Sequence, residues 1–454
     1  MGIAAQLGGT AALAAVFGRL VDVAVDDACY VAPEVSLNAL MQTNLAPEFK
    51  GTREGQEAEA ILRKCVHCGF CTATCPTYQL LGDELDGPRG RIYLMKQVLE
   101  GAPVTRKTQQ HLDRCLTCRN CESTCPSGVQ YGHLVDIGRK LVDERVERPA
   151  GERALRWLLK EGLTSPLFGP AMKLGQLVRP LLPQTLKNKV PQPAGPRAQQ
   201  WPTREHKRKV LMLMGCVQPA MMPNINSATA RVLDAAGIQT LVADGEGCCG
   251  AIRSHLGDAE GGLADMRRNI DAWWPLVQGL TSQGRVEAIV MNASGCGVAV
   301  KDYGHALAHD PHYADKARRV SELTRDLSEL LPHIVPALLG KLRGPKPTRL
   351  AFHPPCTLQH GQQLRGGVET HLAALGFEVS LAASDSHLCC GSAGTYSVLQ
   401  PELAYQLRDR KLAQLQPLQP QAIISANIGS IQHLQTGTTT PVRHWVEVLD
   451  EALG

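Results

Sequence analysis

Apolar residues in the first part of the chain recur at the spacing of amphipathic helices. Residues 53–64, Gly90–Leu99 and Thr108–Leu116 place apolar side chains every three or four positions. Residues 132–182 continue the pattern with leucine, valine and tryptophan, interrupted by prolines. Between Pro183 and Pro202 the chain is rich in proline, alanine and glutamine, which is typical of a linker. The pattern therefore predicts a helical first part that ends at a linker.

After the linker, short apolar runs alternate with helical patterns in two similar copies. The first copy predicts a strand Val210–Met214, a helix Ala228–Ala236, a strand opening at Gly237, a helix Ala259–Trp274, a strand Ala288–Met291 and a closing helix Val320–Leu331. The second copy repeats this order at Leu350–Phe352, Glu369–Leu375, a strand opening at Gly376, Pro401–Leu415, Ala422–Ser425 and Trp445–Leu453. Such alternation predicts two α/β units with parallel sheets, related by internal duplication.

Composition and charge are those of a folded protein without a strongly charged partner. Hydrophobic residues make up 44% and charged residues 20% of the 454 positions, which is ordinary for a globular core. Aromatic residues account for 4% and the formal net charge is +4, so we expect no nucleic-acid partner. No apolar stretch reaches the roughly 18–20 residues that a membrane span needs. Sixteen cysteines favour a reducing, cytoplasmic compartment where thiols stay free for metal.

The most specific signal is a cysteine pattern that occurs twice, 50 residues apart. The first run consists of Cys65, Cys68, Cys71 and Cys75, followed by Pro76, and the second of Cys115, Cys118, Cys121 and Cys125, followed by Pro126. In two-cluster ferredoxins the first three cysteines of such a run bind one cluster, and the fourth ligates the other cluster. We therefore predict one [4Fe–4S] cluster on Cys65, Cys68, Cys71 and Cys125, and a second on Cys115, Cys118, Cys121 and Cys75.

Zinc is the alternative ligand for such thiols. Paired Cys-x2-Cys motifs also build zinc ribbons. The third cysteine of each run and the Cys-Pro ending have no role in a zinc ribbon, so the spacing favours iron–sulfur clusters. Two clusters a short distance apart would form an electron relay. His67, inside the first run, either tunes a cluster sulfur or faces solvent.

Each α/β unit carries further cysteines where its predicted strands end, at the edge where open α/β sheets place their sites. The first copy offers Cys216, Cys248, Cys249 and Cys296, and the second offers Cys356, Cys389 and Cys390, with Ser430 at the position of the last cysteine. A metal centre or a redox thiol site is one interpretation. Buried structural cysteines beside glycines that permit tight turns are the other, and both stay open for the first copy. The second copy lacks a full ligand set unless His353, His360 or His387 completes it.

These patterns divide the chain into five segments. We predict an N-terminal extension at 1–40, an α-helical ferredoxin module with two [4Fe–4S] clusters at 41–145, a helical connector and proline-rich linker at 146–206, and cysteine-rich Cys-Cys-Gly (CCG) α/β units at 207–340 and 341–454. The extension is expected because the stretch from Met41 reads like a natural N-terminus and alanine, glycine and valine dominate the part before it. Cys29, in that part, is expected to bind nothing.

Several stretches also resemble a known family. They are CVHCGFCTATCPTYQLLGDELDGPRGRIYLMKQVLEG, HLDRCLTCRNCESTCPSGVQY, RNIDAWWP, ASGCG, DSHLCCGSAGTYS and VRHWVEVL. They are similar to the iron–sulfur subunits of glycolate oxidase (glycolate dehydrogenase), within a wider group that accompanies flavin dehydrogenases of 2-hydroxy acids. The likeness runs from about Met41 to the C-terminus, and the long first stretch is specific to this family.

The resemblance implies an electron-transfer subunit. Partner subunits would oxidise glycolate, or the related D-lactate, at FAD, and this chain would pass the electrons to a membrane quinone from a peripheral position on the inner face of the cell membrane. We expect no flavin or nicotinamide site in the chain itself, because no Gly-x-Gly-x-x-Gly fingerprint follows a strand.

The chain departs from heterodisulfide-reductase-type units, which resemble it in the CCG motif. Such units end in Cys-x2-Cys, whereas Ala293 and Ser430 replace cysteines here, and Pro354-Pro355 stands where relatives often place another. A full five-cysteine noncubane cluster is therefore not expected in either copy. The alternative functions are a thiol/disulfide reductase subunit of heterodisulfide-reductase type and an iron–sulfur sensor. The first would still need an electron donor, and the second lacks a nucleic-acid-binding module.

Overall fold

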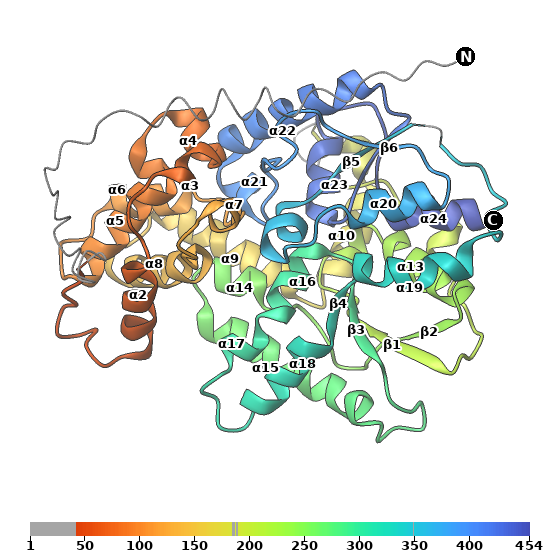
Figure 1. Cartoon of the computed structure of the whole chain (residues 1–454), viewed down its shortest axis with the longest axis horizontal. Helices are drawn as coiled ribbons and strands as arrows, with labels where there is room; N and C mark the ends of the chain where they lie inside the picture. The colour runs from red at the N-terminus through yellow and green to blue at the C-terminus, as the bar shows by residue number, and fades with distance from the viewer. Residues whose placement is uncertain (1–41, 184–186, 188, 348) are drawn as a thin grey trace, which may run out of the picture.

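The first part of the chain is built of helices (Figure 1, orange). The computed structural model describes residues 42–454 apart from 184–186, 188 and 348, so the predicted extension 1–40 and Cys29 lie outside the described residues. The helices are α2 (Arg53–Arg63), α3 (Phe70–Ala73), α4 (Pro76–Leu81), α5 (Pro88–Leu99), α6 (Arg106–Asp113), α7 (Asn120–Thr124), α8 (Tyr131–Arg145), α9 (Ala150–Thr164) and α10 (Phe168–Leu177), with the 3₁₀ turns η2 (Glu84–Asp86), η3 (Arg179–Leu181) and η4 (Pro196–Gln199).

Helices α2, α5 and α8 enclose the core of this part. Leu62, Met95 and Leu134 are fully buried and belong to one cluster of apolar side chains. Helices α5 and α8 approach closely at Gly138, where a Cβ atom would lie 2.5 Å from the sulfur of Met95. Helix α5 begins at Pro88, two residues before the predicted start, because proline suits the first turn, where its missing N–H is not needed. The cysteine loops follow α2 and α6, so the core fixes their starting points.

The second part holds two four-stranded parallel sheets, which confirms the predicted duplication of α/β units. The first unit contains β1 (Arg208–Met212), α12 (Gln218–Met221), α13 (Asn224–Ala235), β2 (Ile238–Leu241), α14 (Ala251–His255), α15 (Ala259–Gln278), β3 (Ala288–Met291), α16 (Ser294–Lys301), α17 (Tyr303–Ala306), α18 (Ala314–Leu323), β4 (Thr324–Asp326) and α19 (Leu327–Leu338). Its strand order is β2-β1-β3-β4.

The second unit repeats the arrangement with strand order β6-β5-β7-β8. It contains β5 (Leu350–His353), the π-helical turn η5 (Thr357–Gly361), α20 (Gly367–Ala374), β6 (Val379–Leu381), α21 (Tyr396–Leu399), α22 (Pro401–Leu415), η6 (Gln416–Leu418), β7 (Ala422–Ser425), α23 (Ile428–Gln435), β8 (Val442–His444) and α24 (Trp445–Leu453). The central strands are buried along their whole length, as expected when helices cover both faces of a parallel sheet.

The fourth strand of each sheet was not expected, and the predicted closing helix Val320–Leu331 is wrong. The segment is α18, the short strand β4 and α19. Asp326 ends the strand and caps α19. Its side chain accepts from Ser328 N, and its backbone N–H donates to the Glu329 carboxylate. Such a capping box starts a new helix and interrupts the old one. His444 and Glu447 form the matching box between β8 and α24 in the second unit.

The two α/β units share one apolar core. Helix α13 of the first unit packs on α24 of the second, and buried residues from both sheets belong to the same cluster. An ion pair reinforces this contact, because the Arg231 guanidinium donates to both carboxylate oxygens of Asp450 at 2.8 Å. The units therefore form a continuous body.

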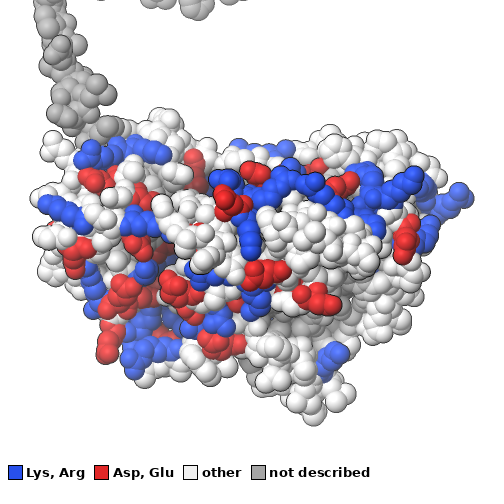
Figure 2. All heavy atoms as spheres, turned by 90° about the horizontal axis from the view of Figure 1, so that it is seen from below, with Lys and Arg blue, Asp and Glu red and all other residues white. Residues whose placement is uncertain are grey.

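The helical first part lies against both α/β units (Figure 1). Tyr396 of the second unit donates from its hydroxyl to Arg114 O at 3.1 Å, and Arg53 donates to His305 O in the first unit at 3.1 Å. Seen from below, acidic and basic side chains intermingle over the left half of the surface (Figure 2), which fits the small formal net charge of +4. Among the described residues, no helix combines the length and apolar character needed to cross a bilayer.

Candidate metal centres

The two cysteine runs form loops of the same shape. Cys65 follows α2, and Cys115 follows α6 in the same way, each backbone N–H donating to the leucine three residues earlier. The residues on either side of the second cysteine have left-handed backbones: His67 (φ 53°) and Gly69 (φ 83°) beside Cys68, and Thr117 (φ 51°) and Arg119 (φ 57°) beside Cys118. A left-handed residue turns the chain sharply. Two such turns curl each loop so that its thiols can face one volume.

The first thiol cavity is lined by cysteines of both runs. They are Cys65, Cys68, Cys71 and Cys125, with Cys121 also reaching its wall. Cys65 and Cys68 stand in the loop, Cys71 lies in α3, and Cys125 follows α7. The structure thus brings together the four residues predicted to share one cluster, and their ligand role stays a prediction.

The second thiol cavity is lined by the other predicted set. Its cysteines are Cys75, Cys115, Cys118 and Cys121. Cys75 of the first run thus lines the second cavity, and Cys125 of the second run lines the first. Each stands just before a proline that redirects the chain. Four thiols around each volume are the donor set that a [4Fe–4S] cluster requires, so the residues fit such a group. Cys121 reaches both cavities, and the two sites therefore adjoin.

Burial dominates the chemistry of these thiols. It raises the pKa of Cys65 and Cys75, and it raises the pKa of Cys71 to about 11. The charge of Arg91 opposes this effect at Cys75. A metal binds thiolate rather than thiol, so loading these sites must release protons.

A buried ion cluster stands behind the second thiol cavity. The Arg91 side chain is 1% exposed and lines this cavity. Its Nε donates to His111 O at 2.7 Å, and its guanidinium also bonds Thr77 Oγ1 at 3.2 Å and Asp86 Oδ1 at 3.4 Å. Asp86, with no exposed side-chain surface, also accepts from Arg114 at 2.8 Å. Arg91 lies one turn before buried Met95 in α5, so the helical pattern marks its position as inward-facing, a signal that sequence reasoning missed.

The two cavities differ in exposure. Cys68 is exposed beside the first cavity, and its apolar neighbours Val66 and Phe70 are 53% and 61% exposed. The second cavity lies under the second α/β unit, because Leu116 and Cys118 pack against Cys356 and Cys389. Among the described residues, the first thiol cavity is therefore the more exposed of the two.

All four predicted cysteines of the first α/β unit come together. The Cys248 thiol lies beside those of Cys216 and Cys249, and the Cys249 thiol lies beside that of Cys296. The neighbouring thiols lower the pKa of Cys248, so one thiolate is stabilised within the group. Gly250 (φ 90°) allows the turn after the pair, where a Cβ atom would meet Gly262 O at 2.8 Å.

The second α/β unit has a smaller cluster of cysteines, which lies against the second thiol cavity. The Cys356 thiol lies beside those of Cys389 and of Cys118 in the second cysteine run, and the Cys389 thiol lies beside that of Cys390. Sequence reasoning missed the contact between Cys118 and Cys356, because nothing in either segment signals a contact between residues so distant in the chain.

The predicted histidine ligands are not all available. Buried His353 lies against the thiol of Cys390. His360 uses one ring nitrogen on Ser123 Oγ at 3.0 Å and the other on His387 O at 2.8 Å. His360 therefore ties the second unit to the second cysteine run and does not face the thiols.

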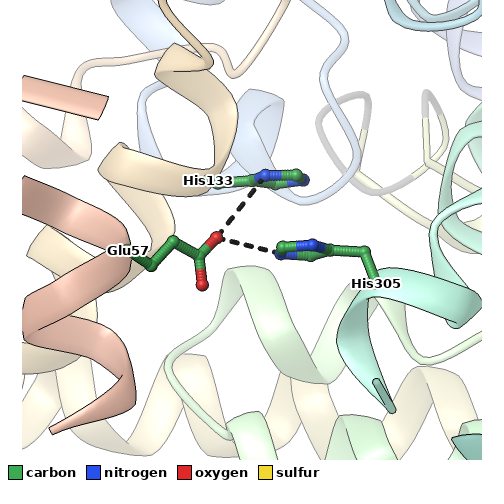
Figure 3. Close-up of side chains that lie close together, drawn as sticks. All are labelled: Glu57, His133 and His305. Atoms are coloured by element: carbon green, nitrogen blue, oxygen red, sulfur yellow. Dashed lines mark ion pairs between the residues drawn. The ribbon is translucent and has the colours of Figure 1, made fainter. Parts of the chain in front are cut away.

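A histidine–carboxylate cluster joins α2, α8 and α17 (Figure 3). Glu57 Oε1 lies 2.9 Å from His305 Nε2 and 3.6 Å from His133 Nδ1, and His133 Nε2 lies 3.1 Å from Asp302 Oδ2. The two imidazole rings are stacked, with centroids 4.1 Å apart and an angle of 2° between them. Ring lone pairs lie in the ring planes, so parallel rings do not aim at one ion. We interpret this cluster as an ion-pair contact between the helical part and the first unit.

This contact is expected to depend on pH. Burial alone would lower the pKa of His133, but the hydrogen bond to Asp302 and the charge of that carboxylate raise it. The bond from His305 lowers the pKa of Glu57. His133 therefore adds stability that is complete below its ordinary pKa of about 6.5 and is lost as pH rises through the raised value. Glu57 adds stability above its ordinary value of about 4.3, which is lost as pH falls.

We expect His133→Gln to lower the melting temperature by roughly 2–4 °C at pH 6 and by much less at pH 9. Thermal unfolding followed by circular dichroism at both pH values measures the difference. His312→Gln is the control, because His312 is exposed. An equal loss at both pH values would contradict this assignment.

Comparison with known proteins places these sites in a class. The family model for a 4Fe-4S dicluster domain matches residues 61–129, and that for a cysteine-rich domain matches residues 210–301 and 350–432. Together they define an iron–sulfur protein with a duplicated cysteine-rich region.

Similar proteins narrow the class to a family. The chain is 55% identical to the glycolate oxidase iron-sulfur subunit of Escherichia coli (strain K12), over 91% of this chain and 99% of that protein. It is 29% identical to the probable glycolate oxidase iron-sulfur subunit of Bacillus subtilis (strain 168), over 84% and 89%. Lactate utilization protein A of Bacillus velezensis matches 53% of the chain at 25% identity. The chain belongs to the family of glycolate oxidase iron–sulfur subunits.

Proposed function

We propose that this chain is the iron–sulfur electron-transfer subunit of a flavin-dependent glycolate dehydrogenase complex. FAD in partner subunits oxidises glycolate to glyoxylate, and this chain carries the electrons towards a membrane quinone from the cytoplasmic side. The observation that carries the proposal is the convergence of eight thiols from two interleaved loops on two adjoining cavities. The 55% identity to a glycolate oxidase iron-sulfur subunit supports the choice of complex.

Residues 41–145 form the helical dicluster module in this proposal. Cys65, Cys68, Cys71 and Cys125 hold one [4Fe–4S] cluster, and Cys115, Cys118, Cys121 and Cys75 hold the other. When bound, each cluster supplies one-electron transfer. Residues 146–206 are the connector, and the α/β units span 207–340 and 341–454.

The chain's own residues tune these sites. The Tyr131 hydroxyl donates to Cys115 Sγ at 3.6 Å, whereas Thr77, 3.3 Å from Cys75 Sγ, donates its hydroxyl proton to Asp86 O at 2.7 Å. Hydrogen bonds to sulfur and nearby positive charge both favour the reduced, more negative state of a cluster. Arg91 beside the second site and Arg89 beside the first would each favour the reduced state of a cluster bound there.

Glycolate oxidation itself is assigned to the partner subunits. Cluster chemistry does not remove hydride from an α-carbon, a task that belongs to flavin. We expect the chain alone to show no glycolate-dependent reduction of a redox dye, and the assembled complex to reduce both dye and quinone. Glycolate turnover by this chain free of flavin subunits would overturn the division of labour.

We propose that the four clustered cysteines of the first α/β unit form a further metal or redox site on the route to quinone. They are Cys216, Cys248, Cys249 and Cys296. Parallel assays of the complex test it with Cys249→Ser, which should abolish quinone reduction and spare dye reduction upstream. Cys390→Ser should act more mildly, since Ser430 replaces a thiol in the second unit. Equal losses in both assays, together with lower protein yield, would make Cys249 structural, at a cost of about 1–3 kcal/mol.

Two other functions are less well supported. Lactate utilization protein A relatives match only about half of the chain, so D-lactate is a secondary substrate candidate for the partner subunits. A reductase of heterodisulfide-reductase type would use a fuller cysteine set than Ala293 and Ser430 leave.

A further inference from the structure

Large apolar side chains stand out into solvent along the connector. They are Trp157 (62% exposed), Leu158 (59%), Leu167 (73%), Leu174 (62%), Leu177 (76%) and Leu181 (86%), and we call them the connector surface. All six lie within 25 residues of chain that form α9, α10 and η3. Single exposed leucines are common, but a run of this kind marks a surface that meets another apolar phase.

Other residues of these helices are held on the first α/β unit. Arg253 of the first α/β unit donates to both carboxylate oxygens of Glu161, at 3.0 and 2.9 Å, and Lys160 pairs with Asp258 at 2.9 Å. Gln176 of α10 donates to Ala220 O at 3.5 Å. These contacts hold α9 and α10 on the first unit. The described residues leave the connector surface exposed to solvent.

Charge around the connector surface favours an anionic partner. Residues 162–203 contain no aspartate or glutamate and five basic residues, of which Arg197 pairs with Asp450 at 2.9 Å; the other four are Lys173, Arg179, Lys187 and Lys189. Leucine and tryptophan flanked by lysine and arginine are typical of helices that lie in the bilayer interface.

We propose that the connector surface docks on the anionic face of a phospholipid bilayer. Trp157 and the leucines enter the boundary between headgroups and acyl chains, while Lys173 and Arg179 face the lipid phosphates. This arrangement rests on the proposed function only in that it brings the electron relay to the membrane where the quinone resides.

Vesicle co-sedimentation of the full chain tests this docking. The chain should bind vesicles of phosphatidylglycerol and phosphatidylcholine and bind pure phosphatidylcholine much more weakly. Leu174→Glu/Leu177→Glu should reduce the association constant at least tenfold, and Lys173→Ala/Arg179→Ala by roughly fivefold for each charge at low salt. Leu280→Glu is the matched control, because Leu280 is 76% exposed in the first α/β unit and should not matter.

Three results would overturn the proposal. They are absence of binding to anionic vesicles, unchanged binding by the double glutamate variant, and an equal loss in Leu280→Glu. If the glutamate pair folds poorly, Leu174→Ala/Leu177→Ala must still bind more weakly than the wild-type chain. Weakened association with the flavin subunits, without vesicle binding, would assign the surface to that interface instead. Vesicle binding needs neither glycolate nor electron transfer, so its failure leaves the proposed function untouched.

Discussion

Replacing Cys75 with serine should remove the second cluster and spare the first, although Cys75 belongs to the first cysteine run. Its thiol lines the second cavity with Cys115, Cys118 and Cys121. Cys125→Ser should have the converse effect, because Cys125 lines the first cavity. Each variant should lose up to about half of the iron that the two clusters would supply, since serine is a poor replacement for a thiolate ligand.

Paramagnetic resonance of the dithionite-reduced variants distinguishes the two clusters. The interaction between two reduced clusters should disappear in both variants, leaving two different single-cluster spectra. The Cys75→Ser spectrum should match that of Cys118→Ser, and the Cys125→Ser spectrum that of Cys68→Ser. Matching within each run would contradict the exchange of ligands.

Replacing Asp86 with asparagine should lower the free energy of unfolding by about 3–5 kcal/mol, because it leaves the guanidinium of Arg91 buried without a countercharge. Asp86 has no exposed side-chain surface and bonds Arg91, Arg114 and His111. Unfolding in guanidinium chloride under anaerobic conditions measures this loss, from the shift in the denaturant concentration at the midpoint of unfolding.

Glu84→Gln is the control for this buried pair. Glu84 pairs with Arg89 at 2.6 Å, but both side chains are well exposed, at 40% and 38%. Such a surface pair contributes under about 1 kcal/mol. Similar losses of unfolding free energy in both variants would show that burial does not determine how much the ion pairs of Asp86 stabilise the fold.

Local patterns carried most of the sequence-based prediction. The spacing of the cysteines reflects how a short loop wraps a cluster, so both thiol sets could be grouped before the fold was known. The duplicated α/β units followed from alternating strand and helix periods. Strands β4 and β8 were not predicted, because each is short and runs directly into a helix, although the capping boxes at Asp326 and His444 signal where those helices begin.

Long-range contacts could not be predicted in the same way. The contact between Cys118 and Cys356 and the hydrogen bond between His360 and Ser123 depend on how the second unit packs on the helical part. His133 and His305 are distant in the chain and meet only across the contact with the first unit. A sequence pattern records the neighbours of a residue along the chain, whereas these partners are set by packing.

Iron and acid-labile sulfide analysis of the anaerobically purified chain tests whether the eight cysteines of the two runs hold two [4Fe–4S] clusters. We expect about eight irons and about eight sulfides per chain from these sites. Any iron above that number should disappear in Cys249→Ser if the first α/β unit also binds metal. A chain that carries zinc instead of iron, or only about four irons, would contradict the assignment of two [4Fe–4S] clusters.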